Sequence, residues 1–377
     1  MALDVVILGA GFAGLELATR LSQDVPDDVA VTLIDESDAF VFGYSKLDVM
    51  FGHQPIDAVR IPYREISKTG VEFRQERITA IDPSARRVVT DEGSYDADVL
   101  VVALGADLDP AATPGLEEGG YEFYSVAGAE RVRDMLPSFE GGEVVISILG
   151  PFFKCPAAPY EAALMLHDYM KQRSTPKPTS IKVMTPMPMP IPISPVASEK
   201  IVEALRARDI EFFPETVVTG LDPEQRTATL RDGGSVPYDL FLGIPVHVAP
   251  PVVVEGGLTE EDGWIAIDPA TFATRFPDVY AAGDITSAPV PRVGVIAESE
   301  ASTVADVLVH RIRGGEEPAP FPGIVTCYIE FGDGHVARFD ADFMTGPAPT
   351  STFLEASLEL AESKREFGSS RRARWFG

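Results

Sequence analysis

Two cysteines, Cys155 and Cys327, are the only thiols of the 377-residue chain, and they lie far apart in the sequence. Cys155 follows Lys154 and stands just before a helix that Pro159 can open. A neighbouring cation and the positive end of a helix dipole both stabilise a thiolate, so we expect a lowered pKa for the Cys155 thiol. Two interpretations are open: the cysteines are unrelated buried thiols, or they form one functional redox pair.

Glu161 follows in the predicted helix and carries a carboxyl group that can exchange protons. If the fold brings it close to the thiol, it can act as general acid and base for sulfur species. It can equally be an ordinary acidic residue of a first helical turn, where the dipole favours negative charge. We predict no metal site, because the five histidines lack the spacing of metal ligands. They are His53, His167, His247, His310 and His335.

A glycine-rich turn near the N-terminus has the full context of a dinucleotide-binding unit: a buried strand, three glycines, a helix, a second strand and a closing acid. These are Leu3–Leu8, Gly9, Gly11, Gly14, a helix to about Gln23, Val29–Ile34 and Asp35. The glycines allow a tight turn, close approach to a pyrophosphate and packing of helix on strand. The helix N-terminus favours phosphate, and the acid can accept hydrogen bonds from ribose hydroxyls. The segment predicts a bound dinucleotide.

A second anchor lies late in the chain, where the short strand Val279–Ala282 ends in Gly283 and Asp284 before a helix. A carboxylate at this place can bind a polyol chain, or it can simply cap the helix. Taken with the N-terminal motif, this segment resembles the FAD-binding flavoproteins that have two dinucleotide domains. The resemblance covers essentially residues 1–310 and implies that Asp284 contacts the ribityl chain of FAD.

Two further glycines enter through the same resemblance. Val99–Gly105 is similar to the family's intermediate strand-to-glycine motif, although Leu104 stands where that motif usually has Thr. The helix near Gly294 follows a proline-rich loop. Its N-terminus could lie near the flavin pyrimidine and stabilise the anionic reduced ring, or the loop could be a plain connection. We therefore expect Gly105 and Gly294 to bind FAD.

The second domain lacks a complete nucleotide turn. Its first strand, Glu143–Leu149, runs into Gly150, after which bulky rings and prolines occupy the place of the other glycines. Prolines also remove N–H donors that would hold a phosphate. NAD(P)H is therefore not expected to be the electron donor.

Lys154–Glu161 closely resembles the Cys-Pro-x-Ala-Pro-Tyr-Glu motif of sulfide:quinone oxidoreductases and flavocytochrome c sulfide dehydrogenases, and Thr326–Tyr328 resembles the segment around their C-terminal cysteine. The resemblance implies a redox disulfide on one flavin face, with Cys327 nearer the reactive flavin carbon and Cys155 receiving sulfide. There are departures. Many quinone-linked members have a third cysteine that this chain lacks. The flavocytochrome branch is exported, whereas this chain begins with a strand almost at Met1, which leaves no room for a signal peptide. We expect a cytoplasmic protein.

Charge and hydropathy exclude other partners. Acidic residues outnumber basic ones 58 to 31, which gives a formal net charge of -27. Such a chain repels phosphate backbones, so nucleic acid is not expected as a partner. No apolar stretch approaches the roughly 18 residues that a membrane-spanning helix needs.

The C-terminal segment ends in the basic and aromatic stretch Arg371–Gly377, behind an amphipathic helix predicted over Thr352–Phe367. Such a tail could lie peripherally on the cytoplasmic face of an anionic membrane, as a quinone reductase requires. The apolar side chains of Leu354, Leu358 and Ala361 could equally cover the core or a second copy in a homodimer.

The sequence therefore predicts an α/β protein with two Rossmann-like domains and a small α+β C-terminal segment. We place an FAD domain in residues 1–110 and 246–312, a second domain, degenerate for NAD(P), in 111–245, and the C-terminal segment in 313–377. The first hypothesis for function is an FAD enzyme that oxidises sulfide or a related small sulfur donor and reduces a quinone or a protein acceptor. The alternatives are a type II NADH:quinone reductase-like enzyme and a non-enzymatic flavin redox sensor.

Overall fold

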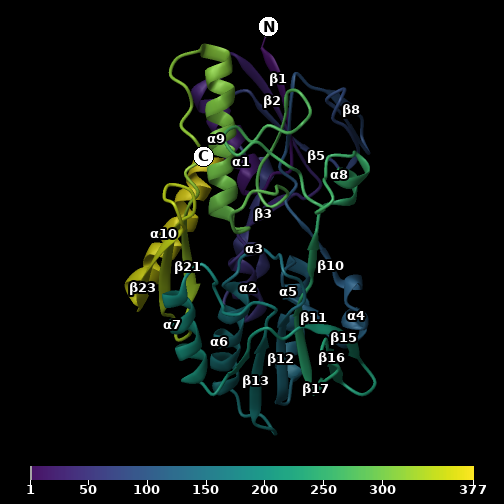
Figure 1. Cartoon of the computed structure of the whole chain (residues 1–377), viewed down its shortest axis with the longest axis vertical. Helices are drawn as coiled ribbons and strands as arrows, with labels where there is room; N and C mark the ends of the chain where they lie inside the picture. Colours follow the sequence, from purple (N-terminus) through teal and green to yellow (C-terminus); the bar gives the residue numbers. More distant parts are fainter. Residues whose placement is uncertain (1) are drawn as a thin grey trace.

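A computed structural model describes residues 2–377 and contains two five-stranded parallel sheets, one in each half of an elongated molecule (Figure 1). The first sheet has the order β20-β9-β1-β2-β5. Its strands are β1 (Leu3–Leu8), β2 (Val29–Asp35), β5 (Val71–Gln75), β9 (Val99–Val102) and β20 (Val279–Ala281). Helices α1 (Phe12–Asp24) and α9 (Gly294–Arg313) pack side by side against it. The inner strands are continuous apolar runs because both faces of a parallel sheet are buried.

The second sheet has the order β11-β18-β12-β13-β14. Its strands are β11 (Tyr121–Glu122), β12 (Gly142–Ile148), β13 (Thr179–Met184), β14 (Glu211–Phe213) and β18 (Leu240–Ile244). Its helices are α5 (Val126–Met135), α6 (Ala158–Lys171) and α7 (Pro195–Arg206). The predicted α/β fold with two Rossmann-like sheets is confirmed. The predicted domain boundaries stay predictions.

Each parallel sheet is accompanied by a three-stranded antiparallel meander. The meanders are β6 (Ile78–Asp82), β7 (Arg87–Thr90) and β8 (Ser94–Asp96), and β15 (Val218–Asp222), β16 (Thr227–Leu230) and β17 (Ser235–Pro237). The pair β10 (Asp107–Asp109) and β19 (Val246–Val248) joins the two halves, and β3 (Ala39–Val41) pairs with β4 (Arg60–Pro62). Short helices complete the chain: α2 (Ser45–Met50), α3 (Ile56–Val59), α4 (Leu116–Gly119), α8 (Pro251–Glu255), and 3₁₀ turns at Tyr63–Glu65, Pro110–Ala112 and Leu136–Ser138.

The segment from residue 71 to 82 reads locally as one antiparallel strand, and the structure differs from that pattern. The structure divides it between β5, the parallel edge strand of the first sheet, and β6, the first strand of the meander. The division falls at Glu76, whose backbone N–H donates to the carbonyl of Asp35 at the end of β2. A partner strand far away in the sequence therefore decides this element, which local alternation cannot indicate.

The C-terminal segment departs further from its prediction. A three-stranded antiparallel sheet of β21 (Ile324–Glu330), β22 (Val336–Asp342) and β23 (Thr350–Ser357) precedes the last helix, α10 (Leu358–Phe376). The residues at 352–357 are strand rather than helix because they pair with β22. Ser357 then caps α10 by accepting a hydrogen bond from the N–H of Leu360. The basic tail is not loose: it is the last part of α10, and Figure 1 shows its end beside α1 and α9.

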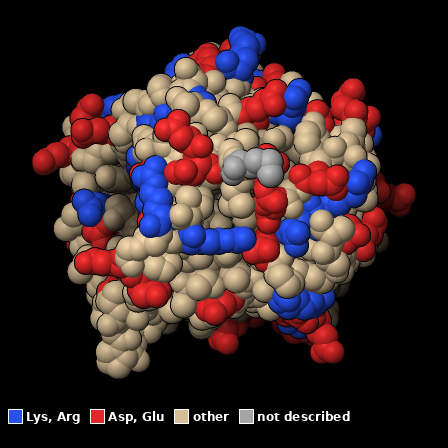
Figure 2. Space-filling model, turned by 90° about the horizontal axis from the view of Figure 1, so that it is seen from above, with Lys and Arg blue, Asp and Glu red and all other residues tan. Residues whose placement is uncertain are grey.

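The surface at the N-terminal end of the molecule carries acidic and basic side chains next to each other (Figure 2). Two ion pairs fix the end of α9 there: Arg311 to Asp278 at 2.6 Å and Arg313 to Asp28 at 3.3 Å. The charges described on this face are therefore mixed rather than gathered into a patch of one sign. Within residues 2–377, helices of the length and apolarity that a bilayer crossing requires do not occur.

Candidate active site

A cavity of about 480 Å³ extends from the glycine turn after β1 to the two cysteines. Nearly all of the predicted site residues line it, although they come from both halves of the chain. These are Gly9, Gly11, Asp35, Gly105, Cys155, Glu161, Gly283, Asp284, Gly294 and Cys327. Gly14 is the exception, and its role is structural. The residues that follow strands of the first sheet come together because the carboxyl ends of its parallel strands meet at one edge. Ligands of such folds bind at this edge.

The glycine turn has the geometry of a phosphate site. Gly9 has a φ of 99°, which a side chain would strain. A Cβ atom on Gly14 would lie 1.9 Å from the carbonyl oxygen of Gly9, so only glycine permits α1 to approach the strand this closely. In contrast, a Cβ atom on Gly11 would meet no protein atom within 4 Å, which leaves space for a ligand at the N-terminus of α1.

Asp35 and Tyr63 shape the end of the cavity nearest β2. The Oδ2 atom of Asp35 accepts a hydrogen bond of 2.8 Å from the N–H of Ala10, and its Oδ1 atom accepts one of 2.8 Å from Ser37. The Tyr63 hydroxyl donates to the carbonyl of Ala10 at 2.8 Å. These contacts hold the turn in place. The lone pairs of the Asp35 carboxylate that face away from the backbone remain able to bind a ribose.

Asp284 lies at the other end of the cavity, after β20. Burial raises the pKa of its carboxyl group, with the charges of Lys154 and Arg292 acting in the opposite direction. Its supports were not predicted from the sequence. Glu300, which is buried in α9, accepts a hydrogen bond from the N–H of Gly283 at 2.5 Å, and Arg292 donates to the carbonyl of Asp284 at 2.9 Å. Burial raises the pKa of Glu300 to about 8.

The starts of α1 and α9 meet at Phe12 and Gly294. A Cβ atom on Gly294 would lie 2.5 Å from the Phe12 ring, so the absence of a side chain allows the first turn of α9 to reach the cavity. Two helix N-termini therefore face one cavity, and each favours negative charge. This arrangement fits FAD: the α1 turn suits its pyrophosphate, Asp35 a ribose, Asp284 the ribityl chain, and the start of α9 the flavin ring.

Cys155 and Cys327 come from the loop before α6 and from β21, and both are free thiols that line the cavity. The backbone of Cys155 has a φ of 57°, in the left-handed region that is costly for a residue with a side chain. Its N–H donates to the carbonyl of Arg292 at 2.8 Å, and its carbonyl accepts from the Tyr124 hydroxyl at 3.4 Å. The fold therefore holds a strained conformation that turns this residue toward the cavity.

The expected lowering of the Cys155 pKa is wrong. Burial raises the pKa of this thiol to about 12, and the negative charge of Glu161 adds to the effect. The cations that act on this thiol are Lys46 and Lys364 rather than the predicted Lys154, whose ammonium group donates to the carbonyl of Ala106. Lys46 partly offsets the shift. Burial also raises the pKa of Cys327, with the charge of Cys155 as the next cause.

Glu161 lies in the first turn of α6 and is buried, with only 2% of its surface exposed. Burial raises the pKa of its carboxyl group to about 7, which suits a group that exchanges protons near neutral pH. Its Oε1 atom accepts a hydrogen bond of 2.9 Å from the N–H of Glu330. The charge of Lys364, a buried residue of α10, lowers the pKa in part. The sequence carries no local signal that would have identified Lys364.

A second cavity of about 480 Å³ is also lined by Cys327. It is lined mainly by apolar side chains, among them Ile191, Ile329, Phe339 and Phe343, and Arg292 lies between the two cavities. The Arg292 guanidinium stacks on the Trp264 ring at 3.9 Å. Cys327 is therefore accessible from an apolar space as well as from the cofactor cavity.

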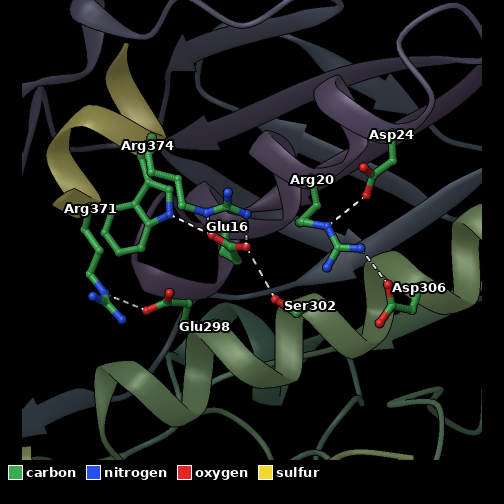
Figure 3. Close-up of polar contacts among 9 residues, drawn as sticks. Glu16, Arg20, Asp24, Glu298, Ser302, Asp306, Arg371 and Arg374 are labelled. Carbon is green, nitrogen blue, oxygen red and sulfur yellow. Dashed lines mark hydrogen bonds and ion pairs between the residues drawn. The ribbon is translucent and has the colours of Figure 1, made fainter. Parts of the chain in front are cut away.

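The end of α10 is attached to the helices that frame the cofactor cavity (Figure 3). Arg374 donates to both carboxylate oxygens of the buried Glu16 in α1, at 2.6 and 2.9 Å, and the Trp375 indole N–H donates to the same group at 2.9 Å. Arg371 pairs with Glu298 of α9 at 2.7 Å. The tail thus joins α1 to α9, a contact that the sequence analysis did not predict.

Comparison with known proteins agrees with this site. The sequence profile of the pyridine nucleotide-disulphide oxidoreductases matches residues 3–147 and 160–302. The mitochondrial sulfide:quinone oxidoreductase of Mus musculus is 22% identical over 373 residues, which are 95% of this chain and 82% of that protein. The structure of the sulfide:quinone oxidoreductase from Aquifex aeolicus superposes with a TM-score of 0.89 at 22% identity, and covers 100% of this chain and 92% of the other. A type II NADH:quinone oxidoreductase of Staphylococcus epidermidis is 32% identical over 130 residues, which are 34% of this chain and 32% of that protein.

These matches confirm the resemblance stated from the sequence motifs. The family profile spans the strands and helices of both parallel sheets, and the solved structure shares the fold over the whole chain. The sequence match to the Staphylococcus epidermidis enzyme covers a third of the chain. The structure of NDH2 from Plasmodium falciparum in complex with NADH shares the fold over 100% of this chain, with a TM-score of 0.77 at 12% identity. The chain belongs to the pyridine nucleotide-disulphide oxidoreductase family, whose members are FAD-dependent flavoproteins.

Proposed function

We propose that this protein oxidises sulfide, or a related small sulfur donor, through a Cys155–Cys327 pair and reduces a quinone. The observation that carries the proposal is the shared cavity: both cysteines and Glu161 line the same space as the glycine turn and Asp284. A cavity that holds FAD therefore presents two thiols and one proton-exchanging carboxyl group to the cofactor. The relatives named for sulfide and quinone support both substrates.

The chemistry begins with the cysteines joined as a disulfide. Hydrosulfide attacks the Sγ atom of Cys155, the S–S bond breaks, and Cys327 leaves as a thiolate while Cys155 carries the persulfide. FAD supplies the two-electron carrier between this thiolate and the quinone. Burial disfavours the thiolate of Cys327, so that sulfur is a strong electron donor once it is released. Glu161 can take the proton of the sulfur donor because its own pKa is about 7.

An anaerobic titration of the FAD-loaded protein with sulfide tests this proposal. We expect the yellow flavin absorbance to bleach in the wild type and to persist in Cys155→Ser and Cys327→Ser. If both single variants bleach as the wild type does, the cysteine pair has no role in the reaction. If the wild type does not bleach, the protein does not use sulfide.

A second candidate, reduction by NADH, is favoured by the partial match to type II NADH:quinone oxidoreductases. The loop after β12 argues against it, because Phe152, Phe153 and two prolines stand where a pyrophosphate would need small residues. Phe153 is also buried and so cannot simply swing aside. Rapid anaerobic bleaching by NADH would support this alternative over sulfide oxidation.

Contact with a membrane is a separate part of the proposal, because quinones are dissolved in lipid. Of the possibilities left open for the tail, burial in the core is the one that fits its aromatic end, since Trp375 and Phe376 are buried with 0% and 5% of their surface exposed. Leu354 and Leu358, at the junction of β23 and α10, are exposed and suit a peripheral contact on the cytoplasmic face. Sedimentation with anionic vesicles should be lost in Leu354→Glu/Leu358→Glu. A homodimer stays a prediction, which light scattering can test.

A further inference from the structure

The buried carboxyl group of Glu161 is the inner end of a row of ionisable side chains that leads to the surface. Hydrogen bonds join Glu161, Glu330 and Lys364. Asp48 interacts with the charges of Lys364 and Glu161, and His53 lies beside Asp48. These residues come from α6, α10, β21, and α2 with the loop that follows it. No local pattern in the sequence connects them. Side-chain exposure rises along the row, from 10% at Lys364 and 18% at Glu330 to 23% at Asp48 and 57% at His53.

The inner part of the row is tightly bonded. The backbone N–H of Glu330 donates to Glu161 at 2.9 Å, and the side chain of the same Glu330 accepts from the ammonium group of Lys364 at 2.6 Å. Lys364 also interacts with the charge of Glu161. One buried cation therefore faces both carboxyl groups, so that a change of protonation at either one is felt by the other.

The outer part of the row is organised by helix α2. The ammonium group of Lys364 lies 4.9 Å from the centre of the Tyr44 ring, and Asp48 follows Tyr44 by one helical turn on the same side of the chain. Asp48 in turn interacts with the charges of Lys364 and Glu161. The Nδ1 atom of His53 lies 3.8 Å from Oδ1 of Asp48, so the two side chains are close enough for their charges to interact.

We propose that Asp48 and His53 form the solvent end of a proton-transfer path that supplies Glu161. The inference rests on the proposed function, because that reaction consumes protons in the cavity. Oxidation of hydrosulfide to the sulfur atom of a persulfide gives two electrons and one proton. Reduction of a quinone to a hydroquinone takes two electrons and two protons. Each turnover therefore needs one further proton from solvent, and the row connects solvent to the cavity.

The charges around both ends suit this direction of transfer. Glu161 faces Lys364, Glu330, Asp48 and the two thiols, while His53 faces Asp48 and Glu330. The interaction with Asp48 raises the pKa of His53, so the imidazole is positively charged more often near neutral pH than a free histidine. A protonated His53 at the surface can therefore donate a proton, and Glu161 with a pKa of about 7 can accept one near neutral pH.

The test uses the FAD-loaded protein reduced with dithionite, so that it does not depend on sulfide. Reoxidation by a water-soluble quinone, which takes protons, is compared with reoxidation by ferricyanide, which takes only electrons. We expect His53→Ala and Asp48→Asn to slow the quinone reaction by roughly five- to twentyfold and to leave the ferricyanide reaction unchanged. Added imidazole should restore the His53→Ala rate, and the slowed reaction should show a larger solvent deuterium isotope effect. His335→Ala, an exposed histidine that contacts only its own loop at Asp333, is the matched control.

Several results would overturn the path. They are an unchanged quinone rate in both variants, an equal loss with ferricyanide, and a His53→Ala rate that imidazole does not restore. A wild type that quinone does not reoxidise would overturn it as well. If sulfide fails to bleach the flavin but these proton-dependent differences appear, the proposed sulfur donor is wrong and the path stands.

Discussion

The guanidinium group of Arg374, at the very end of the chain, binds the carboxylate of Glu16, which lies one turn inside the first helix of the FAD-binding unit. Glu16 is only 3% exposed, and the Trp375 indole donates to it as well. A charge buried this far needs its partners, because the protein no longer offers it water. The C-terminus is thus part of the frame of the cofactor cavity.

Replacing Arg374 should therefore weaken both the fold and cofactor retention. Arg374→Ala leaves a buried carboxylate with only the indole and Ser302 as side-chain donors, which should cost about 1–3 kcal/mol of unfolding free energy. Because Glu16 belongs to the helix that starts at the glycine turn, FAD should dissociate more readily. Thermal unfolding and flavin fluorescence on dilution measure the two effects. Arg372→Ala, which removes an exposed pair with Glu65, should change neither, and an equal loss in both variants would contradict the assignment.

The reactivity of Cys155 gives a second prediction. The deprotonated fraction of a thiol with a pKa of about 12 rises with every pH unit below that value. The alkylation rate of Cys155 should therefore increase about tenfold per pH unit through pH 10, with no plateau. The measurement is iodoacetamide labelling of reduced Cys327→Ser protein, followed by mass spectrometry. Burial lowers the pKa of Lys46 to about 8, so its charge stabilises the thiolate mainly below that pH. Lys46→Met should therefore slow labelling by about threefold or more below pH 8 and change it less above.

Lys154→Met is the informative comparison for this experiment. The sequence places Lys154 beside Cys155, but Lys46 and Lys364 are the cations that stabilise its thiolate, so labelling should change less than in Lys46→Met. A plateau near neutral pH would show that Cys155 has the low pKa first expected from its neighbours in the sequence.

The parts of the site that sequence predicts well are those encoded locally. The turn from Gly9 to Gly14, the acid Asp35 and the Gly283–Asp284 pair each depend on a strand end and a helix start that are adjacent in the chain. For the same reason, the two parallel sheets follow from apolar runs alone. Because the glycine turn packs closely against its own strand, few other conformations are open to this segment.

The parts that sequence could not predict depend on long-range packing. Glu300 supports Gly283, Tyr124 holds Cys155, and Lys364 meets Glu161 only after the chain has folded. The same reason explains the error at Cys155, since its burial outweighs the charges of neighbouring residues. It also explains β23, whose residues become strand only beside β22.

Buried carboxyl groups should make the protein less stable as the pH rises. Glu300 has a folded-state pKa of about 8, above its ordinary value of 4.5. Between these two pH values the folded state binds more protons than the unfolded state, so the free energy of unfolding falls with increasing pH. Glu300→Gln keeps an oxygen for the N–H of Gly283 but cannot ionise. Its melting temperature should therefore exceed that of the wild type by about 2–4 °C at pH 8 and converge with it near pH 5. Glu362→Gln at the surface should follow the wild type, and a parallel offset at every pH would instead indicate a change in packing.

Two glycines of one turn should separate folding from cofactor binding. In Gly14→Ala the new methyl group meets the backbone oxygen of Gly9 at 1.9 Å, so α1 must move away from its strand and the apoprotein should lose stability. In Gly11→Ala the methyl group meets no protein atom within 4 Å, so the apoprotein should melt as the wild type does. It would project into the space assigned to the pyrophosphate, and FAD affinity should fall by roughly tenfold or more. Melting of the apoproteins and fluorescence titration with FAD give the two readings. Unchanged FAD binding in Gly11→Ala would mean that the dinucleotide does not approach this turn, and the assignment of the whole cavity would then be wrong.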